Sequence, residues 1–490
     1  MRNFKKIIAL IVAVITVMSC AVPMVQAADP KLNHRKDFDW GVVMHTPNMS
    51  GKAYNTAYLE EHLHLAAEMG SKLIRIDTNT GALAYTDKLV RLANAYGMKV
   101  MIIIYIPGKT LTGEYDYDAI EQHFRTFASR YDGKKGYGKA DYIQIDNEMD
   151  VTLMNSSSKG VSGGQNISDY DEPHLRTLTG QVKAALKGVK NSGTSAKTII
   201  NFGWTHWGMF DYFVKEGVQW DIIGYDWYSD MFQPDKNPNN YFWAGDIVYE
   251  KYKKKIVICE TNMNGHVIGS NPSSAEVNKW HSNASNWDPL VKCMEHYYNK
   301  DYVIGCTFYE FCDELEREGE KYEPEARYGL LFTDKNTGAV IEPKPIYYRI
   351  QKMIGGGTVK KLDWSKVLAT YKDDDDEEED EIGQNNNSQS GNVNVITNQI
   401  HIGGNSGNSQ NSGTTNQTGS GDTITEIFRE EDATGTGESN KIFTLPIIIC
   451  LVAGGLIVLL AIGLGVFFIL RKPKAVSKEI PEAEATNENE

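Results

Sequence analysis

The sequence predicts an α/β fold, a (β/α)8 TIM barrel, followed by a disordered stalk and one C-terminal transmembrane helix. Short apolar runs alternate with amphipathic helical patterns between residues 40 and 309, and eight of these runs have the length of a buried strand. Strands that alternate with helices favour parallel pairing, and eight repeats favour closure into a barrel over an open sheet. Polar residues also gather at the ends of the runs rather than at their starts. A barrel that carries its active site at the strand ends would show this pattern.

The expected strands and helices follow from local signals. The eight strands are expected at 40–45, 72–77, 99–105, 142–147, 198–203, 221–225, 255–260 and 303–309. Asn55 can cap a helix that Gly70 ends, and Asp118 with Glu121 has the form of a capping box. Residues 288–289, Asp-Pro, open a further helix with proline at its first position.

The two ends of the chain predict export and anchoring. Basic residues, an apolar run over 7–18 and a small-residue site ending at Ala27 have the order of a secretory signal peptide, residues 1–27. An uncleaved anchor is the alternative, but the run is shorter than the ~20 residues that a span needs. Residues 442–470 are uncharged and long enough to cross a bilayer, and a basic flank begins the expected cytoplasmic tail, 471–490. We expect a single-pass protein of the cell membrane whose larger part is extracellular.

A linker, 371–441, separates this membrane helix from the folded part of the chain. Residues 373–381 are all acidic, and 383–425 are mostly Asn, Gly, Ser, Gln and Thr, with too few large apolar groups to offset the entropy of folding. Residues 28–370 remain as one folded domain, a length that a barrel fills. The net charge of −14 repels nucleic acid, so no nucleic-acid partner is expected.

Four cysteines lie in the expected folded domain: Cys259, Cys293, Cys306 and Cys312. Their spacing matches no zinc pattern. An extracellular disulfide among them is chemically possible, but sequence alone does not pair them.

Two glutamates are the strongest candidates for chemistry. Glu148 ends the fourth expected strand and Glu260 the seventh, and these strands face each other across the mouth of an eight-stranded barrel. Retaining glycosidases need two carboxyl groups ~5 Å apart, one to attack the anomeric carbon and one to protonate the leaving oxygen. Burial and the partner's negative charge help the acid to keep its proton. Taken alone, Asn147-Glu148 would fit a solvated loop carboxylate better than a catalytic group.

At these residues the sequence resembles the clan A glycoside hydrolases, the superfamily of cellulases, mannanases, β-galactanases, β-xylosidases and β-galactosidases. The resemblance covers about residues 38–352, including 70–75 as second strand, 218–228 as sixth, and 328–332 with 342–347 as the tail after the eighth. It implies a retaining glycoside hydrolase that acts on O-glycosidic bonds of a polysaccharide or oligosaccharide without a cofactor.

The resemblance also implies roles for individual residues. Glu148 would be the acid/base, Glu260 the nucleophile, and Asn147 a ligand of the sugar 2-hydroxyl. Arg75 and Tyr228 would support the nucleophile. The sequence departs from the clan at Asp146, where Trp or Gly is common, at Asp226, where His is frequent, and at 308–310, where many members place a Trp under the sugar.

Aromatic and polar residues near the expected strand ends are candidates for sugar binding. Trp204 and Trp227 are the preferred stacking platforms, because aromatic faces pack on the apolar faces of pyranose rings. For Trp243, Trp280 and Trp287 core packing is at least as good an explanation. His45 and His206 would bind sugar hydroxyls or satisfy backbone groups, and Tyr309 would bind or support the substrate. The acidic residues after the eighth strand are expected to form a solvated rim rather than a calcium site; they are Asp313, Glu314, Glu316, Glu318 and Glu320.

Two other functions compete with hydrolysis. A catalytically inactive carbohydrate-binding surface protein could keep the barrel, but it would be expected to have lost a carboxylate, and both are present. A metal-dependent barrel hydrolase would need His-x-His on the first strand, and Val43 stands where the first His would be. We therefore expect no metal and no other cofactor.

Overall fold

The computed structural model describes residues 28–47, 52–108, 115–154, 163–232, 243–263, 274–315 and 325–371, all within one compact unit. The predicted signal peptide, nearly all of the linker, the membrane helix and the tail lie outside the described residues. None of the helices in the described part of the chain is long and apolar enough to cross a membrane.

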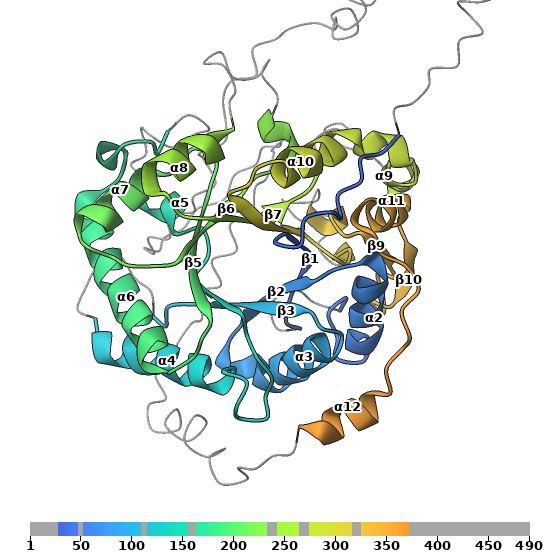
Figure 1. Cartoon of the computed structure of the whole chain (residues 1–490), viewed down its shortest axis with the longest axis horizontal. Helices are drawn as coiled ribbons and strands as arrows, with labels where there is room; N and C mark the ends of the chain where they lie inside the picture. Colours follow the sequence, from blue (N-terminus) through green and yellow to red (C-terminus); the bar gives the residue numbers. More distant parts are fainter. Residues whose placement is uncertain are drawn as a thin grey trace, which may run out of the picture. The chain divides into compact units, whose positions relative to one another are not determined.

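Eight parallel strands form a closed barrel in which each strand pairs with the next and β8 pairs with β1 (Figure 1). The strands are β1 (Asp39–Met44), β2 (Leu73–Thr78), β3 (Lys99–Ile104), β4 (Tyr142–Ile145), β5 (Lys197–Gly203), β6 (Ile222–Asp226), β7 (Ile256–Thr261) and β8 (Val303–Phe308). The predicted (β/α)8 barrel and all eight predicted strands are confirmed, with only small differences at the strand ends.

Helices surround the barrel on its outer side (Figure 1). They are α2 (Leu59–Met69), α3 (Leu83–Ala95), α4 (Tyr117–Arg130), α5 (Met149–Leu153), α6 (Glu172–Asn191), α7 (Gly208–Lys215), α8 (Ala244–Tyr252), α9 (Ser274–His281), α10 (Asp288–Tyr298) and α11 (Pro345–Ile354). Beyond β8, β9 (Leu331–Thr333) and β10 (Val340–Pro343) form a two-stranded antiparallel sheet, and α12 (Trp364–Thr370) packs on α3.

Two of the predicted helix starts were wrong. Asn55 does not cap α2; its side chain accepts from the backbone N–H of Ala57 and closes a turn before the helix. Asp116, not Asp118, caps α4, because the Asp116 side chain accepts from a backbone N–H of the first turn while Asp118 already lies inside the helix. Gly70 ends α2 in the left-handed conformation as predicted, with φ 98°. Pro289 is the second residue of α10, one position later than predicted.

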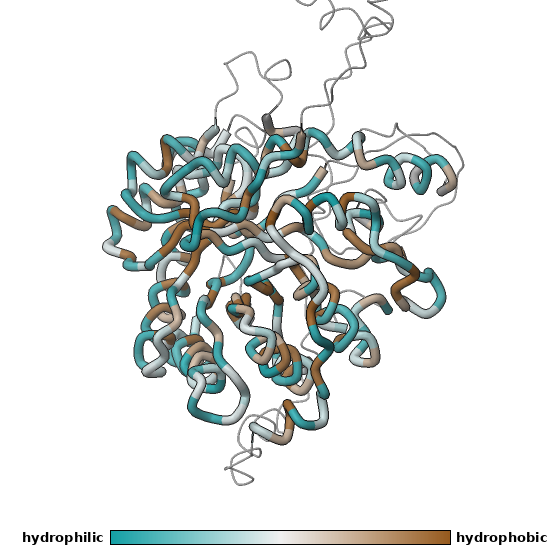
Figure 2. The backbone as a smooth tube through the Cα atoms, turned by 45° about the vertical axis from the view of Figure 1, so that its right-hand side comes forward, coloured by the Kyte–Doolittle hydropathy of each residue, from teal (hydrophilic) through white to brown (hydrophobic). Residues whose placement is uncertain are grey.

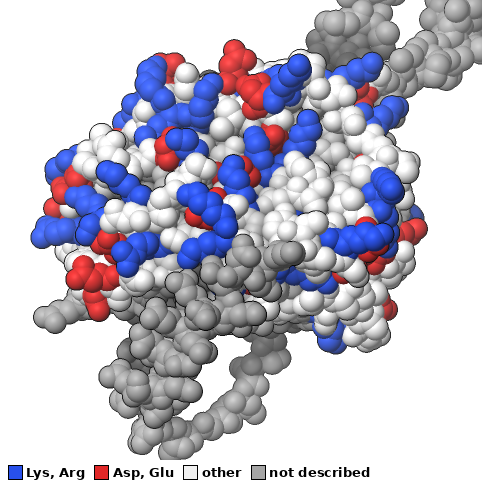
Figure 3. Space-filling model, turned by 60° about the horizontal axis from the view of Figure 1, so that its bottom comes forward, with Lys and Arg blue, Asp and Glu red and all other residues white. Residues whose placement is uncertain are grey.

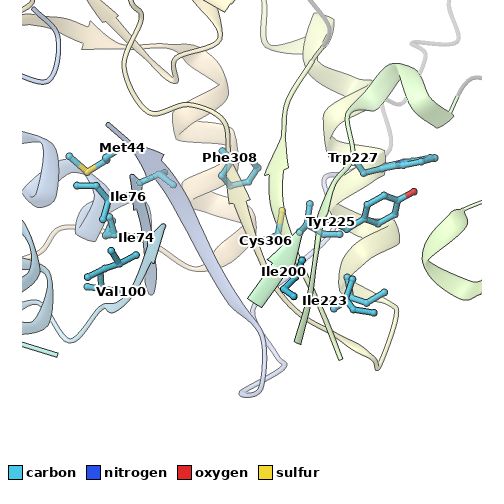
Figure 4. Packing of buried hydrophobic residues seen from close by; sticks show 14 of the residues in the cluster. Met44, Ile74, Ile76, Val100, Ile200, Ile223, Tyr225, Trp227, Cys306 and Phe308 are labelled. Carbon is cyan, nitrogen blue, oxygen red and sulfur yellow. The ribbon is translucent and has the colours of Figure 1, made fainter. Parts of the chain in front are cut away.

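Buried apolar side chains form two layers, one inside the barrel and one between its strands and the surrounding helices. The interior layer comprises Leu73, Met101, Tyr142, Ile199, Ile222, Val257 and Cys259. The outer layer packs between strands and helices, and Figure 4 shows part of it, including Met44, Ile74 and Val100 from β1 to β3. In Figure 2 the hydrophobic colour is interrupted by hydrophilic segments along the surrounding helices, as expected for helices with one buried face.

The four cysteines of the barrel are all free and buried, so none of them forms a disulfide in the structure. On the face drawn in Figure 3, Lys and Arg side chains are interspersed with Asp and Glu side chains. The acidic run at 373–381, a large part of the net negative charge, lies outside the described residues.

Candidate active site

Glu260 lies near the end of β7, where the pairing of β7 with β6 is irregular. Tyr225 pairs with Ile258, but the next residue, Asp226, pairs with Glu260, so Cys259 is an extra residue on β7. Cys259 faces the barrel interior, and regular alternation would turn its neighbour outward. The irregularity therefore allows Glu260 to reach the barrel mouth, a common use of a bulge beside an active site.

Both predicted supports of Glu260 contact its carboxylate. Arg75 Nη1 donates to Oε1 at 2.8 Å, and the Tyr228 hydroxyl donates to Oε2 at 2.8 Å. Burial, the largest single cause, disfavours the charge of Arg75, but the negative charges around it, Glu260 first, together with the hydrogen bond to Glu260 outweigh burial and raise the pKa of Arg75. Burial and the Glu260 charge also raise the pKa of Tyr228 well above its usual value, so its hydroxyl remains a donor. Glu260 is thus held at both oxygens by groups that keep their protons.

Asn147 is oriented by three donors that converge on its amide oxygen. Arg75 Nη2, Asn201 Nδ2 and Gln144 Nε2 donate to Oδ1 at 2.7, 2.8 and 3.0 Å. Arg75 Nε also donates to Gln144 at 2.9 Å, so the guanidinium connects Glu260 with the Asn147 turn. Because the oxygen is engaged, the amide nitrogen of Asn147 is the group that can donate to a ligand.

Glu148 follows β4 through a tight turn. Asp146 and Glu148 both adopt positive φ angles, 57° and 41°, which are unusual for residues with side chains. The carboxylate of Asp146 accepts from the backbone N–H of Asn147 at 2.8 Å, and the backbone N–H of Glu148 donates to Asn201 Oδ1 at 3.0 Å. Gly203 on β5 leaves room for the side chain, because a Cβ there would lie 2.9 Å from Oε1 of Glu148.

The surroundings of Glu148 favour its protonated form. Burial is the largest cause, and the negative charges of Asp226, Glu260 and Asp150 add to it, while Arg75 opposes it. Together they raise the pKa of Glu148 well above its usual value. A carboxyl group that keeps its proton towards neutral pH can act as a general acid.

A family model matches part of the barrel. The model of Glycosyl hydrolase family 53 matches residues 134–288, a segment that contains both Glu148 and Glu260. The prediction of a clan A glycoside hydrolase is confirmed. None of the functionally curated proteins compared with the chain matches it.

Solved structures similar to this clan A hydrolase include two β-glucosidases. The enzyme of Pyrococcus furiosus is 12% identical, with 69% of this chain and 98% of that chain covered and a TM-score of 0.45. The enzyme of Thermotoga maritima, solved with deoxynojirimycin, is 13% identical, with 67% of this chain and 100% of that chain covered and a TM-score of 0.44. At such identities and TM-scores these likenesses carry no information about the substrate.

A second polar cluster of the hydrolase lies where β1 and β8 end. His45 Nδ1 is 2.9 Å from Asp77 Oδ1, and its Nε2 is 3.6 Å from Glu310 Oε2, which accepts from the Tyr54 hydroxyl at 2.9 Å. His45 therefore contacts side chains rather than backbone groups. Among the described residues, His45, Glu310 and Glu314 are those that could hold a cation, with one ligand atom each within 4.8 Å of the others. One imidazole and two carboxylates form a donor set that a divalent cation accepts.

The two preferred tryptophans differ in their exposure. Trp227 is fully buried and packs against Tyr225 and Trp243. The structure therefore does not support Trp227 as a sugar platform for this hydrolase, because its faces are covered by the core. Trp204 is only partly buried. It directly follows Gly203, the residue that lies next to the carboxyl group of Glu148. Its proposed role as a platform stays a prediction.

The remaining candidates divide between packing and the barrel mouth. Trp243 and Trp287 are buried, which agrees with core packing, and Trp280 packs partly buried against the same core. His206 is buried with Nδ1 2.7 Å from Asp150 Oδ2. Tyr309 is partly buried, and its ring lies edge-on to His45 with centroids 5.6 Å apart. Of this group, Tyr309 stays a candidate to contact substrate.

Asp313 and Glu314 are not part of the solvated rim that the sequence predicted after β8. Asp313 and Glu314 are buried, and Asp313 is paired with the ammonium group of Lys344 at 2.6 Å. Charges closely spaced in sequence suggested solvent exposure, but the chain folds inward here and brings a cation to Asp313. Glu316, Glu318 and Glu320 lie outside the described residues.

Sequence reasoning missed several polar residues that build the site. Gln144 stands inside an otherwise apolar strand, and a polar residue at an interior position of a barrel strand was the signal that could have found it. Asn201 lies near the end of β5 and was noted only as one polar residue among many. Tyr54 lies in a loop before α2, and its contact with Glu310 has no local signal in the sequence.

Proposed function

We propose that this clan A hydrolase is a retaining β-glycosidase that cleaves O-glycosidic bonds of an extracellular polysaccharide or oligosaccharide. The observation that carries the proposal is the pair of carboxyl groups at the barrel mouth. Glu260 is held by Arg75 and Tyr228, and Glu148 is buried with a raised pKa. These environments assign two different tasks to two chemically identical groups.

In the first step Glu260 attacks the anomeric carbon of the bound sugar. The glycosidic bond breaks, its electron pair stays on the leaving oxygen, and Glu148 transfers its proton to that oxygen. A glycosyl ester of Glu260 forms. Arg75 and Tyr228 hold the carboxylate in place for the attack, and the amide nitrogen of Asn147 can donate to the sugar 2-hydroxyl.

In the second step Glu148, now ionised, removes a proton from water. The resulting hydroxide equivalent attacks the anomeric carbon, and Glu260 leaves with the electron pair of the ester bond. Two displacements retain the configuration, and both glutamates return to their starting protonation states. The two steps together consume one water molecule and need no metal, redox partner or other co-reactant.

We also propose that the barrel works outside the cell while anchored to the membrane. The predicted signal peptide at 1–27 and the apolar segment at 442–470 support this, with the acidic and Asn/Gly/Ser-rich linker as a spacer from the surface. Protease treatment of intact cells that express the full chain checks the proposal. Cleavage within the linker, with release of the barrel, is expected only if that part faces outward.

Hydrolysis by the purified full chain on a panel of β-linked polysaccharides, with product analysis by chromatography and NMR, tests the activity. The first-formed sugar should have the β configuration. Glu260→Ala should abolish turnover, and azide should restore cleavage of an activated aryl glycoside by Glu148→Ala while yielding a glycosyl azide. Glu250→Ala, which removes an exposed carboxylate, is the control and should act like the parent. An α-configured first product would refute the retaining mechanism, and full activity of Glu260→Ala would place the nucleophile elsewhere.

A further inference from the structure

Asp226 is a third buried carboxyl group at the barrel mouth, and the double displacement uses only two. It ends β6, is 1% exposed, and pairs with Gly203 on one side and Glu260 on the other. Gly203 is the residue that leaves room for the carboxyl group of Glu148. Asp226 therefore lies on the barrel wall between the two glutamates, at the position where the sequence departs from the clan.

One hydrogen-bonded side chain connects Asp226 to the turn that carries Glu148. Asn201 Nδ2 donates to Oδ2 of Asp226 at 2.7 Å and to Oδ1 of Asn147 at 2.8 Å. Asn201 Oδ1 accepts from the backbone N–H of Glu148 at 3.0 Å. Because both ends of the Asn201 amide are engaged, Asp226 fixes its orientation and so the position of the strained turn.

The charges around this site leave one proton for two carboxyl groups. Arg75 on β2 is paired with Glu260 on β7, and Asp150 on α5 is engaged with His206. The other titratable neighbours, Cys259 on β7 and the Tyr228 phenol after β6, have raised pKa values and stay neutral. Burial raises the pKa values of both Asp226 and Glu148, and they cannot readily ionise together.

Hydrogen bonding decides which group keeps the proton. The amide of Asn201 donates to Asp226, and a donor of this kind favours the ionised form of a carboxyl group. Among the described residues no side chain donates a hydrogen bond to the carboxyl group of Glu148. This difference in hydrogen bonding favours the negative charge on Asp226 and the proton on Glu148.

We infer that Asp226 is a positioning residue of this hydrolase, whose buried charge keeps the catalytic proton on Glu148 and whose bond to Asn201 holds the Glu148 turn. The inference rests on the proposed acid/base function of Glu148. In the resting enzyme Glu260 and Asp226 both disfavour ionisation of Glu148. Once Glu260 is esterified its charge is gone, but the charge of Asp226 remains, so Glu148 is a stronger base towards water in the second step.

The pH dependence of kcat/KM on a phenyl glycoside of a sugar that the parent cleaves tests the inference. Phenol is a poor leaving group, so its departure needs the proton of Glu148. Asp226→Asn in the full chain removes the charge and keeps an acceptor for Asn201, and it should move the alkaline limb to lower pH by about one unit. The same limb on a dinitrophenyl glycoside, whose leaving group needs no proton, should not move. Asp211→Asn on α7, which removes a carboxylate bound to Lys251 and Tyr252, is the control and should match the parent.

A titration that does not depend on turnover separates this inference from the proposed function. Carbon-13 NMR of side-chain-labelled glutamate follows Glu148 directly, with its signal assigned by loss in Glu148→Gln. Its midpoint should fall in Asp226→Asn. A parent that cleaves no glycoside would refute the proposed function, and the NMR midpoint would still decide the role of Asp226. If Asp226→Asn does not fold, Asp226→Ser removes the same charge. An unchanged midpoint or an unchanged alkaline limb would overturn the inference.

Discussion

Nη1 of Arg75 and Oε1 of Glu260 lie 2.8 Å apart, and the other two nitrogens of the same guanidinium bond Gln144 and Asn147. One buried side chain on β2 thus sets the positions of groups on β4 and β7. A guanidinium can do this because its donors form a rigid planar fork, whereas an ammonium group is a single point of charge. The catalytic geometry therefore depends on the shape of Arg75 as well as on its charge.

Arg75→Lys should separate these two contributions. The positive charge stays in the barrel, but one ammonium group cannot reach Gln144, Asn147 and Glu260 together. We expect kcat to fall by about 10² or more, as for the loss of a preorganised donor, with much smaller change in the urea midpoint. Steady-state kinetics measure kcat, and urea unfolding measures the midpoint. Arg176→Lys on the exposed surface of α6 is the matched control; a kcat for Arg75→Lys close to that of the control would contradict the role of the fork.

Gly203→Ala should damage catalysis through one added methyl group. The new Cβ would lie 2.9 Å from Oε1 of Glu148, closer than a van der Waals contact permits, so the carboxyl group must move. Displacement of an acid by a fraction of an ångström costs activity much more than stability, and kcat on a poor leaving group should fall by about 10-fold or more.

Gly357→Ala is the control for this change, because its Cβ would meet nothing within 4 Å. An activated leaving group should partly restore the first step in Gly203→Ala, since that step no longer needs the acid. Equal kcat values for Gly203→Ala and Gly357→Ala would show that the carboxyl group of Glu148 can accommodate the added methyl group without loss of function.

The sequence predicted the barrel and the contacts of Arg75 and Tyr228 with Glu260, because strand periodicity and clan motifs are local signals. It did not predict the extra residue at Cys259, which depends on pairing between β6 and β7. The sequence also predicted Trp227 as a sugar platform in the cleft. The pattern of apolar and polar residues along a strand does not show which side chains just beyond the strand end will be covered by a helix. Long-range contacts of this kind are absent from any local pattern.

Buried His62 should make stability depend on pH. Burial lowers its pKa from 6.5 to about 3, and the ring lies between Tyr54 and Phe311 with no exposed surface. Between about pH 6.5 and about pH 3, His62 therefore binds a proton in the unfolded chain but not in the folded chain. Stability from His62 is complete above about pH 6.5 and is lost as pH falls towards about 3.

Urea unfolding between pH 7 and pH 5 should reveal this contribution. Well below the unfolded pKa, His62→Leu should reduce the slope of unfolding free energy against pH by about 1.4 kcal/mol per unit. His34→Gln, which changes an exposed histidine, should leave the slope unaltered. Equal slopes in the parent and His62→Leu would mean that His62 titrates normally in the folded chain.

Lys344 joins the tail of the chain to the segment after β8. Its ammonium group donates to Asp313 Oδ1 at 2.6 Å and to the carbonyl of Arg327 at 3.0 Å, and it lies 3.2 Å from Nδ1 of His281. Both charged side chains are almost completely buried, 0% and 1% exposed. Burial lowers the pKa of Lys344 and raises that of Asp313, so each depends on the other for its charge.

Lys344→Met should lower the free energy of unfolding by about 3–5 kcal/mol, because it leaves the carboxylate of Asp313 buried without its cation. Lys300→Met is the matched control, since Lys300 also pairs with an aspartate but at the surface, and its loss should cost about 1 kcal/mol or less. Adding Asp313→Leu to Lys344→Met should recover much of the stability, because no unpaired charge is then left in the core. Urea unfolding of the three variants at pH 7 measures these differences. If Lys344→Met costs no more than Lys300→Met, the buried pair does not hold the tail against the barrel.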